Sequence, residues 1–142
     1  MSEQNKAIVR RYLDEVFAKG NLDAAPEVFA PDYVEQDPAS DGEIRGHEGV
    51  RRDLLTYQSA FSGIDITVED QIAEDDRVAT RVTFRATHVE EVFGVAPSGN
   101  RVTVTGMVIH RLSDGKLVEG WWNWDTLGLL QQIGAIPAEQ PA

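Results

Sequence analysis

The chain of 142 residues contains no cysteine, which excludes disulfide bonds, thiol nucleophiles, zinc–thiolate sites and iron–sulfur clusters. Basic residues are scarce as well: 13 Lys and Arg stand against 24 Asp and Glu, so the net charge is −11. Nucleic acids and anionic membranes are bound mainly through Lys and Arg, so we expect neither as a partner. No apolar run approaches the roughly 20 residues that span a bilayer, and the first residues lack the apolar stretch of a signal peptide. These absences predict a cytoplasmic protein.

What the chain does contain is enough apolar material for a core. Hydrophobic residues make up 42% of the sequence, which argues against disorder. The length suits one domain, and no internal repeat or low-complexity tract divides it. We expect a single domain over residues 1–136, followed by a flexible tail, 137–142.

Hydrophobic periodicity changes from helical to strand-like near Gly63. Helices are expected over 2–20, 22–29, 47–60 and 126–133, and strands over 33–36, 64–72, 78–88, 102–110 and 116–125. Short connections make the later strands antiparallel neighbours, and Asp114-Gly115 is a hairpin signal. The order predicts an α+β fold: N-terminal helices packed in a curved antiparallel sheet, a cone-shaped barrel, with a short C-terminal helix.

Strand alternation brings several polar side chains toward the inner face of this sheet. The histidines lie in phase with the apolar residues of their strands, and alternate residues of the last strand share one face. If these phases match across the sheet, the groups converge on one apolar cavity, which is typical of a small-molecule site. The expected set is His88, His110, Trp121, Asn123 and Asp125.

Asp125 is the main candidate for chemistry. Apolar walls would disfavour its charged form, which suits a general acid or base. It also directly precedes the closing helix, so it could be only the N-cap of that helix, or serve both roles. His110 could bond a substrate oxygen or share a proton with Asp125, or simply bond backbone or water. No H-x-H or H-E-x-x-H spacing supports a metal site, and none is expected.

The remaining tryptophans suggest self-association. Trp122 and Trp124 alternate with the expected cavity residues, so they should lie on the outer face of the sheet. Exposed aromatic rings there favour a homodimer or higher homo-oligomer that buries this face.

The chain resembles the SnoaL-like polyketide cyclases, also called ester cyclases, of the nuclear-transport-factor-2-like superfamily. The carrying stretches are 5–17, 20–23, 29–34, 46–50, 99–106, 114–119 and, most specifically, 121–134, WWNWDTLGLLQQIG. The resemblance implies an α+β barrel, oligomers and cofactor-free chemistry on polyketide-like esters, with Asp125 as acid/base and a histidine near His110 beside it. Relatives often have Asp-His-Asp-Pro where this chain has Glu35-Gln36-Asp37-Pro38, so Gln36 can hydrogen-bond but not titrate.

The first hypothesis is therefore a cofactor-free cyclase for a small hydrophobic or aromatic substrate. Asp125 would move a proton in an intramolecular aldol-type cyclisation, while His110 and Asn123 hold the oxygens where charge develops. The substrate would contact further residues, expected to be Trp121, His88, Tyr33, Gln36, Phe84 and Phe17. Two alternatives stay open: an isomerase or dehydratase that uses the same pocket, and a noncatalytic small-molecule-binding domain.

Overall fold

The computed structural model describes residues 2–40 and 42–137. The expected tail beyond residue 137 lies outside the described residues. The helical elements are α1 (Ser2–Arg11), η1 (Tyr12–Ala18), η2 (Leu22–Ala24), α2 (Ala25–Val28), α3 (Gly46–Ala60) and α4 (Thr126–Gln132). The strands are β1 (Phe29–Gln36), β2 (Ile44–Arg45), β3 (Phe61–Glu74), β4 (Arg77–His88), β5 (Arg101–Ser113) and β6 (Lys116–Trp124). Each predicted helix and strand therefore has a counterpart.

The N-terminal helix buries one stripe of side chains. α1 runs directly into a π-helical stretch, η1, and together they place Val9, Tyr12, Leu13 and Val16 in the core. The chain leaves η1 at Gly20, whose φ of 74° lies in the left-handed region that glycine adopts without strain. This stop turns the chain back toward β1.

The six strands form one sheet in the order β2-β1-β6-β5-β4-β3. β1 runs parallel to β6, and the other neighbouring pairs are antiparallel. The predicted α+β class is confirmed, but the sheet is mixed and is not closed into a barrel. β1 also begins earlier than expected, at Phe29, because Phe29 already pairs with Leu117 of β6.

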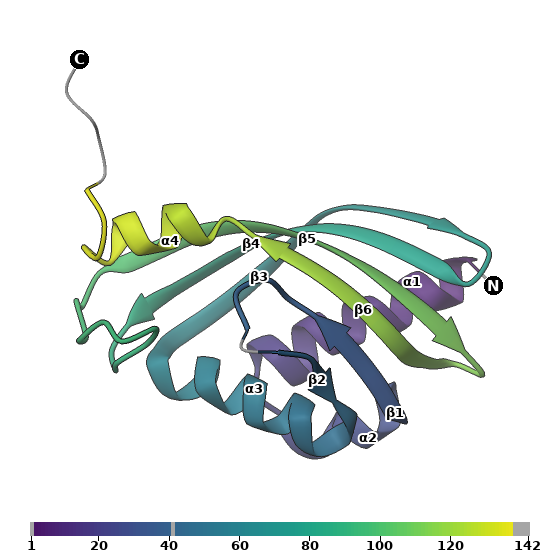
Figure 1. Cartoon of the computed structure of the whole chain (residues 1–142). Coiled ribbons are helices and arrows are strands. Elements are labelled where there is room, and N and C mark those ends of the chain that lie inside the picture. The colour runs from purple at the N-terminus through teal and green to yellow at the C-terminus, as the bar shows by residue number, and fades with distance from the viewer. Residues whose placement is uncertain (1, 41, 138–142) are drawn as a thin grey trace.

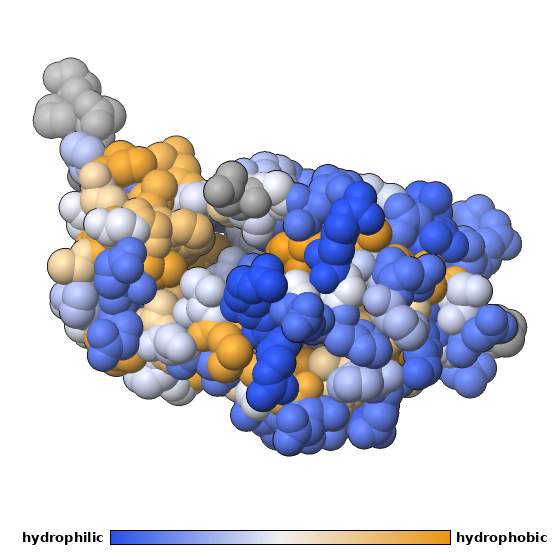
Figure 2. All heavy atoms as spheres, turned by 60° about the horizontal axis from the view of Figure 1, so that its bottom comes forward, coloured by the Kyte–Doolittle hydropathy of each residue, from blue (hydrophilic) through white to orange (hydrophobic). Residues whose placement is uncertain are grey.

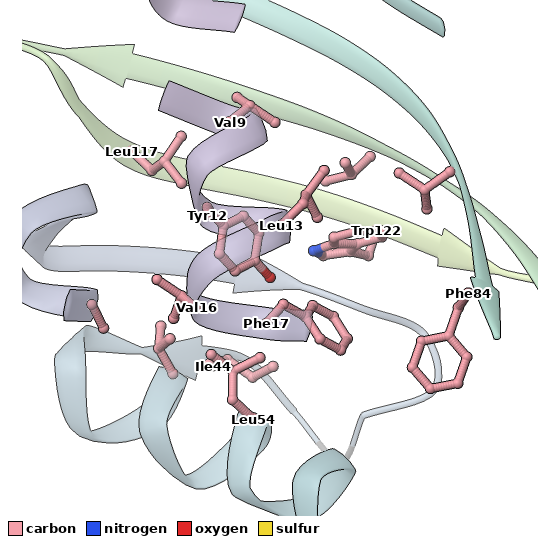
Figure 3. Packing of buried hydrophobic residues seen from close by; sticks show 14 of the residues in the cluster. Val9, Tyr12, Leu13, Val16, Phe17, Ile44, Leu54, Phe84, Leu117 and Trp122 are labelled. Carbon is pink, nitrogen blue, oxygen red and sulfur yellow. The ribbon is translucent and has the colours of Figure 1, made fainter. Parts of the chain in front are cut away.

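Helices cover one face of the curved sheet. Figure 1 shows α1 and α3 beneath its concave side and α4 at one end. Figure 3 shows the side chains of η1 between the sheet and α3, with Trp122 on the side of β6 and Leu54 on the side of α3; all belong to one buried cluster. Each fully buried side chain of this kind stabilises the fold by roughly 1.5–3 kcal/mol relative to exposure. The core therefore lies between the sheet and the N-terminal helices.

Among the described residues, no helix is both long and apolar enough to cross a membrane.

Candidate functional site

A group of polar side chains lies buried in this core, around Gly120 of β6. Glu35 is 5% exposed, and Tyr33, His110 and Gly120 are buried. The hydroxyl of Tyr33 donates to Oε1 of Glu35 over 2.8 Å. A Cβ on Gly120 would collide with the Tyr33 hydroxyl and stand 3.4 Å from Nε2 of His110. The missing side chain of Gly120 therefore leaves the space in which these groups come together.

Burial controls the charge of Glu35. Desolvation, with a smaller contribution from the nearby charge of Asp53, raises its pKa from 4.5 to about 8, while hydrogen bonds from Tyr33 and Trp122 oppose the rise. Burial, followed by the charge of Asp37, also raises the pKa of Asp53, to about 7. Glu35 is thus a carboxyl that can exchange a proton near neutral pH, the range in which general acid–base catalysts work best.

His110 is neutral in the same region. It is fully buried, and burial lowers its pKa from 6.5 to about 3. Neither ring nitrogen has a hydrogen-bond partner among the described residues. The ring packs edge-on against Tyr12 and Trp122, with centroid distances of 5.6 and 6.2 Å. A neutral imidazole can donate through one nitrogen and accept through the other, so His110 offers both functions to whatever reaches it.

A narrow apolar pocket opens at the end of the molecule where α4 lies. It is lined by Ala39, Tyr57, Phe61, Phe84, Phe93, Val104, Trp124, Thr126 and Leu129, none of them charged. Figure 2 shows apolar side chains gathered at this end, beside a hollow in the surface. The pocket volume is about 20 Å³, room for roughly one water molecule. Of the predicted substrate contacts, Phe84 lines this pocket, and Phe17 packs behind it against Phe84 and Trp124.

Two stacked tryptophans separate this pocket from the polar group. The rings of Trp122 and Trp124 lie 4.6 Å apart and are within 6° of parallel. Trp124 faces the pocket, while Trp122 is 2% exposed and contacts His110. The expectation that both rings lie on the outer face of the sheet is therefore wrong.

A β-bulge explains this error. The hairpin begins with the expected register, since Ser113 pairs with Lys116 and Leu112 with Leu117. One residue further on, the register shifts, and Arg111 pairs with Glu119 instead of Val118. The extra residue moves the rest of β6 by one position, which exchanges its two faces.

The bulge places three of the predicted site residues outside the cavity. Asp125 is exposed, and its Oδ1 accepts a hydrogen bond from the backbone N–H of Gly128 over 2.9 Å, so it is the N-cap of α4. Asn123 is exposed on the outer face. Trp121 faces outward too, with the guanidinium of Arg77 5.3 Å from its ring centroid. The predicted placement of these residues in the cavity is wrong, and a catalytic role for Asp125 stays a prediction.

Two further predicted contacts lie apart from the polar group. Gln36 is exposed and donates to Glu43, because alternation along β1 turns it away from Tyr33 and Glu35. His88 is fully buried at the end of β4, where its Nδ1 accepts a hydrogen bond from the backbone N–H of Ser98 over 3.1 Å. Its Nε2 has no partner among the described residues.

Glu35 is absent from the predicted site residues, although the sequence contains a signal for it. Tyr33 is expected on a strand, and the residue two positions later shares its face. A glutamate in phase with an inward tyrosine is unusual, because carboxyl groups are rarely fully buried. Within residues 2–40 and 42–137, no group of three or more His, Asp or Glu residues could hold a metal ion.

Comparison with known proteins gives a consistent result. The family model of the SnoaL-like polyketide cyclases matches residues 7–133. IdmH of Streptomyces antibioticus, a proposed polyketide cyclase, is 32% identical with a TM-score of 0.81, covering 92% of this chain and 99% of its own. AclR of Streptomyces galilaeus, a proposed hydroxylase, is 30% identical with a TM-score of 0.85, covering 99% of this chain and 87% of its own.

TsrD of Streptomyces laurentii is 27% identical with a TM-score of 0.84, and the match covers 94% of this chain and 97% of that one. No curated protein matches the sequence. The family model spans nearly the whole chain and includes both β1, which carries Glu35, and the tryptophan stack of β6. The chain belongs to the SnoaL-like polyketide cyclase family.

Proposed function

We propose that the protein is a cofactor-free cyclase that closes a ring in a polyketide-like ester by an intramolecular aldol reaction, with Glu35 as the acid/base. The observation that carries the proposal is the buried Glu35–Tyr33 pair, whose carboxyl titrates near neutral pH. Family membership and a proposed cyclase among the similar structures support the reaction type.

The intramolecular aldol reaction needs no reactant other than the substrate and the Glu35 carboxylate. The Glu35 carboxylate takes a proton from a methylene flanked by two carbonyl groups, and the C–H electron pair passes into the enolate. The enolate carbon then attacks a second carbonyl carbon of the same molecule, forming the new C–C bond and an alkoxide. The alkoxide recovers the proton from Glu35, so the carboxylate is regenerated and the product is an isomer of the substrate.

Tyr33 and His110 fit supporting roles. Burial raises the pKa of Tyr33 well above 10, so its hydroxyl remains a donor that orients the Glu35 carboxyl. The neutral His110 supplies an N–H without a competing partner, which suits a developing alkoxide. The apolar pocket lined by Tyr57, Phe84 and Trp124 would hold the body of the substrate and exclude water.

The test measures the turnover of a polyketide-like methyl ester that carries a 1,3-dicarbonyl methylene. Two isosteric variants are compared with the wild type. Glu35→Gln should lower kcat by about 10²-fold or more, the contribution typical of general acid–base catalysis. Asp125→Asn, which leaves the carboxyl of Glu35 in place, should retain most of the activity. The reverse pattern would assign the proton transfer to Asp125 instead.

The pH profile and the product provide separate checks. Because the base must be ionised, kcat/KM should rise with pH and level off above about 8. A product with a new carbon–carbon bond supports cyclisation, whereas a shifted double bond or loss of water supports the isomerase or dehydratase alternative. Binding without turnover in the wild type would support a noncatalytic binding domain and reject the cyclase.

A further inference from the structure

The apolar pocket is too small for the ligand that the site is built to hold. Ligand sites typically enclose about 300–1,000 Å³, whereas this pocket measures about 20 Å³. Binding therefore requires a lining side chain to move. Four of the other lining side chains are at most 7% exposed and are packed in the core: Phe61, Phe84, Val104 and Leu129.

Trp124 is the largest lining side chain, and it is only partly buried. It lies directly opposite Gly106 in the β5–β6 register. A Cβ on Gly106 would stand 2.8 and 2.9 Å from Cζ3 and Cδ2 of the indole, and nearer still to Cε3. These separations are well below the 3.5–4.0 Å at which carbon atoms pack. The indole can lie flat on β5 only because residue 106 has no side chain.

The same position closes the way inward. Trp124 stacks on Trp122, whose ring contacts His110. The ring of Trp124 also packs edge-on against Phe17 and Phe84, at centroid distances of 6.4 and 6.1 Å. Because Trp122 is 2% exposed and Trp124 borders the pocket, Trp124 is the ring that can leave the stack first.

We propose that Trp124 is the outer gate on the way from the apolar pocket to the buried Glu35–Tyr33–His110 group, with Trp122 as the inner ring, and that the gate closes by lying against Gly106. The inference rests on the proposed function in taking this polar group as the place a ligand must reach. A ligand that displaces the indole from Gly106 occupies the vacated space against Trp122, the ring that then separates it from His110. The ease of this displacement governs how fast ligands enter.

The gate can be tested without turnover. In a Trp121→Phe background, which removes the outward-facing tryptophan, Gly106→Ala lifts Trp124 away from residue 106 and Trp124→Ala removes the ring. Both substitutions should raise the acrylamide quenching of Trp122 fluorescence several-fold over that of the background protein. The emission of Trp124 is measured in the same proteins carrying Trp122→Phe and is subtracted. Gly49→Ala is the matched control, since a Cβ there meets Ile44 at an ordinary 3.4 Å.

A second measurement follows the entry of an uncharged planar probe, 2-naphthol, by stopped-flow fluorescence. Loss of one aromatic stacking contact should speed its entry into Gly106→Ala by about 2- to 10-fold, while Gly49→Ala behaves like the background. Trp124→Phe, which adds no atom, should give an intermediate rate. It keeps the test valid if the alanine variants fail to fold. Unchanged quenching and unchanged entry in Gly106→Ala and Trp124→Phe would overturn the gate.

The two proposals fail separately. If Glu35→Gln retains full turnover while the quenching results hold, the gate survives and the catalytic assignment is lost. If Glu35→Gln is inactive while the quenching is unchanged, the catalytic assignment survives and Trp124 is a fixed wall.

Discussion

The buried state of Glu35 predicts that the protein loses stability as the pH rises from about 4.5 to about 8. The pKa of its carboxyl is about 8 in the folded protein and 4.5 as its ordinary value. Between these values the folded state holds a proton that the unfolded state releases, so stability is fully present below about 4.5 and falls as the pH rises. Linkage gives a loss of about 1.4 kcal/mol per pH unit from this group, or about 5 kcal/mol across the window.

Glu35→Gln removes this titration while its amide oxygen can still accept the hydrogen bond from Tyr33. In urea unfolding, the free energy of unfolding of the variant minus that of the wild type should therefore rise by about 3 kcal/mol between about pH 5.5 and 7.5. Near pH 8 the variant should be the more stable protein. Taking the difference between the two proteins cancels the titration of groups that do not interact with Glu35.

The exposed Glu48 provides a control for the loss of one negative charge, and Glu48→Gln should show no comparable trend. Asp53→Asn offers a second check, because removing its charge should lower the pKa of Glu35 in the folded protein and bring the upper end of the window to lower pH. A difference between wild type and Glu35→Gln that is constant from pH 5 to 8 would refute the reasoning, since it would mean that folding leaves the carboxyl unperturbed.

Three further changes test other parts of the structure. Asp125→Ala removes the cap on the Gly128 N–H and should cost about 1 kcal/mol in urea unfolding, whereas Asp125→Asn should cost less; equal losses would argue against the cap. Gly120→Ala drives a methyl group into the Tyr33 hydroxyl and should destabilise by about 1–3 kcal/mol; a neutral effect would contradict the close packing. Met107 is 58% exposed on the outer sheet face, so Met107→Glu should shift the predicted homodimer toward monomer in sedimentation velocity, and a wild-type monomer would reject the dimer.

The sequence was sufficient to predict the α+β class and the phases of β4 and β5. Periodicity records which residues of one strand share a face, and His88, His110 and Phe84 are all buried as alternation requires. It does not record how neighbouring strands are aligned. In β6 a bulge near Val118 shifts the pairing by one residue, so Trp122 and Trp124 face inward where Trp121 and Asn123 were expected. The residue types in this stretch do not predict the bulge.

The site itself was harder to predict because it depends on long-range burial. In the expected strand at 33–36, alternation places Glu35 on the face of Tyr33 and Gln36 on the other face. Which face is buried depends on the parallel pairing of β1 with β6, which sets Glu35 opposite Gly120 under the helices and leaves Gln36 at the surface. The raised pKa of Glu35 follows from that pairing, because desolvation is its main cause.

The pairing of β1 with β6 also bears on how the protein is made. A ribosome releases β1 early, but its partner Gly120 is more than 80 residues away along the chain. Contacts of such sequence separation form late, because a long loop has to close first. Until β6 emerges, Glu35 stays hydrated and acidic like any surface glutamate, so the nascent chain lacks the proton-transferring group of the finished protein.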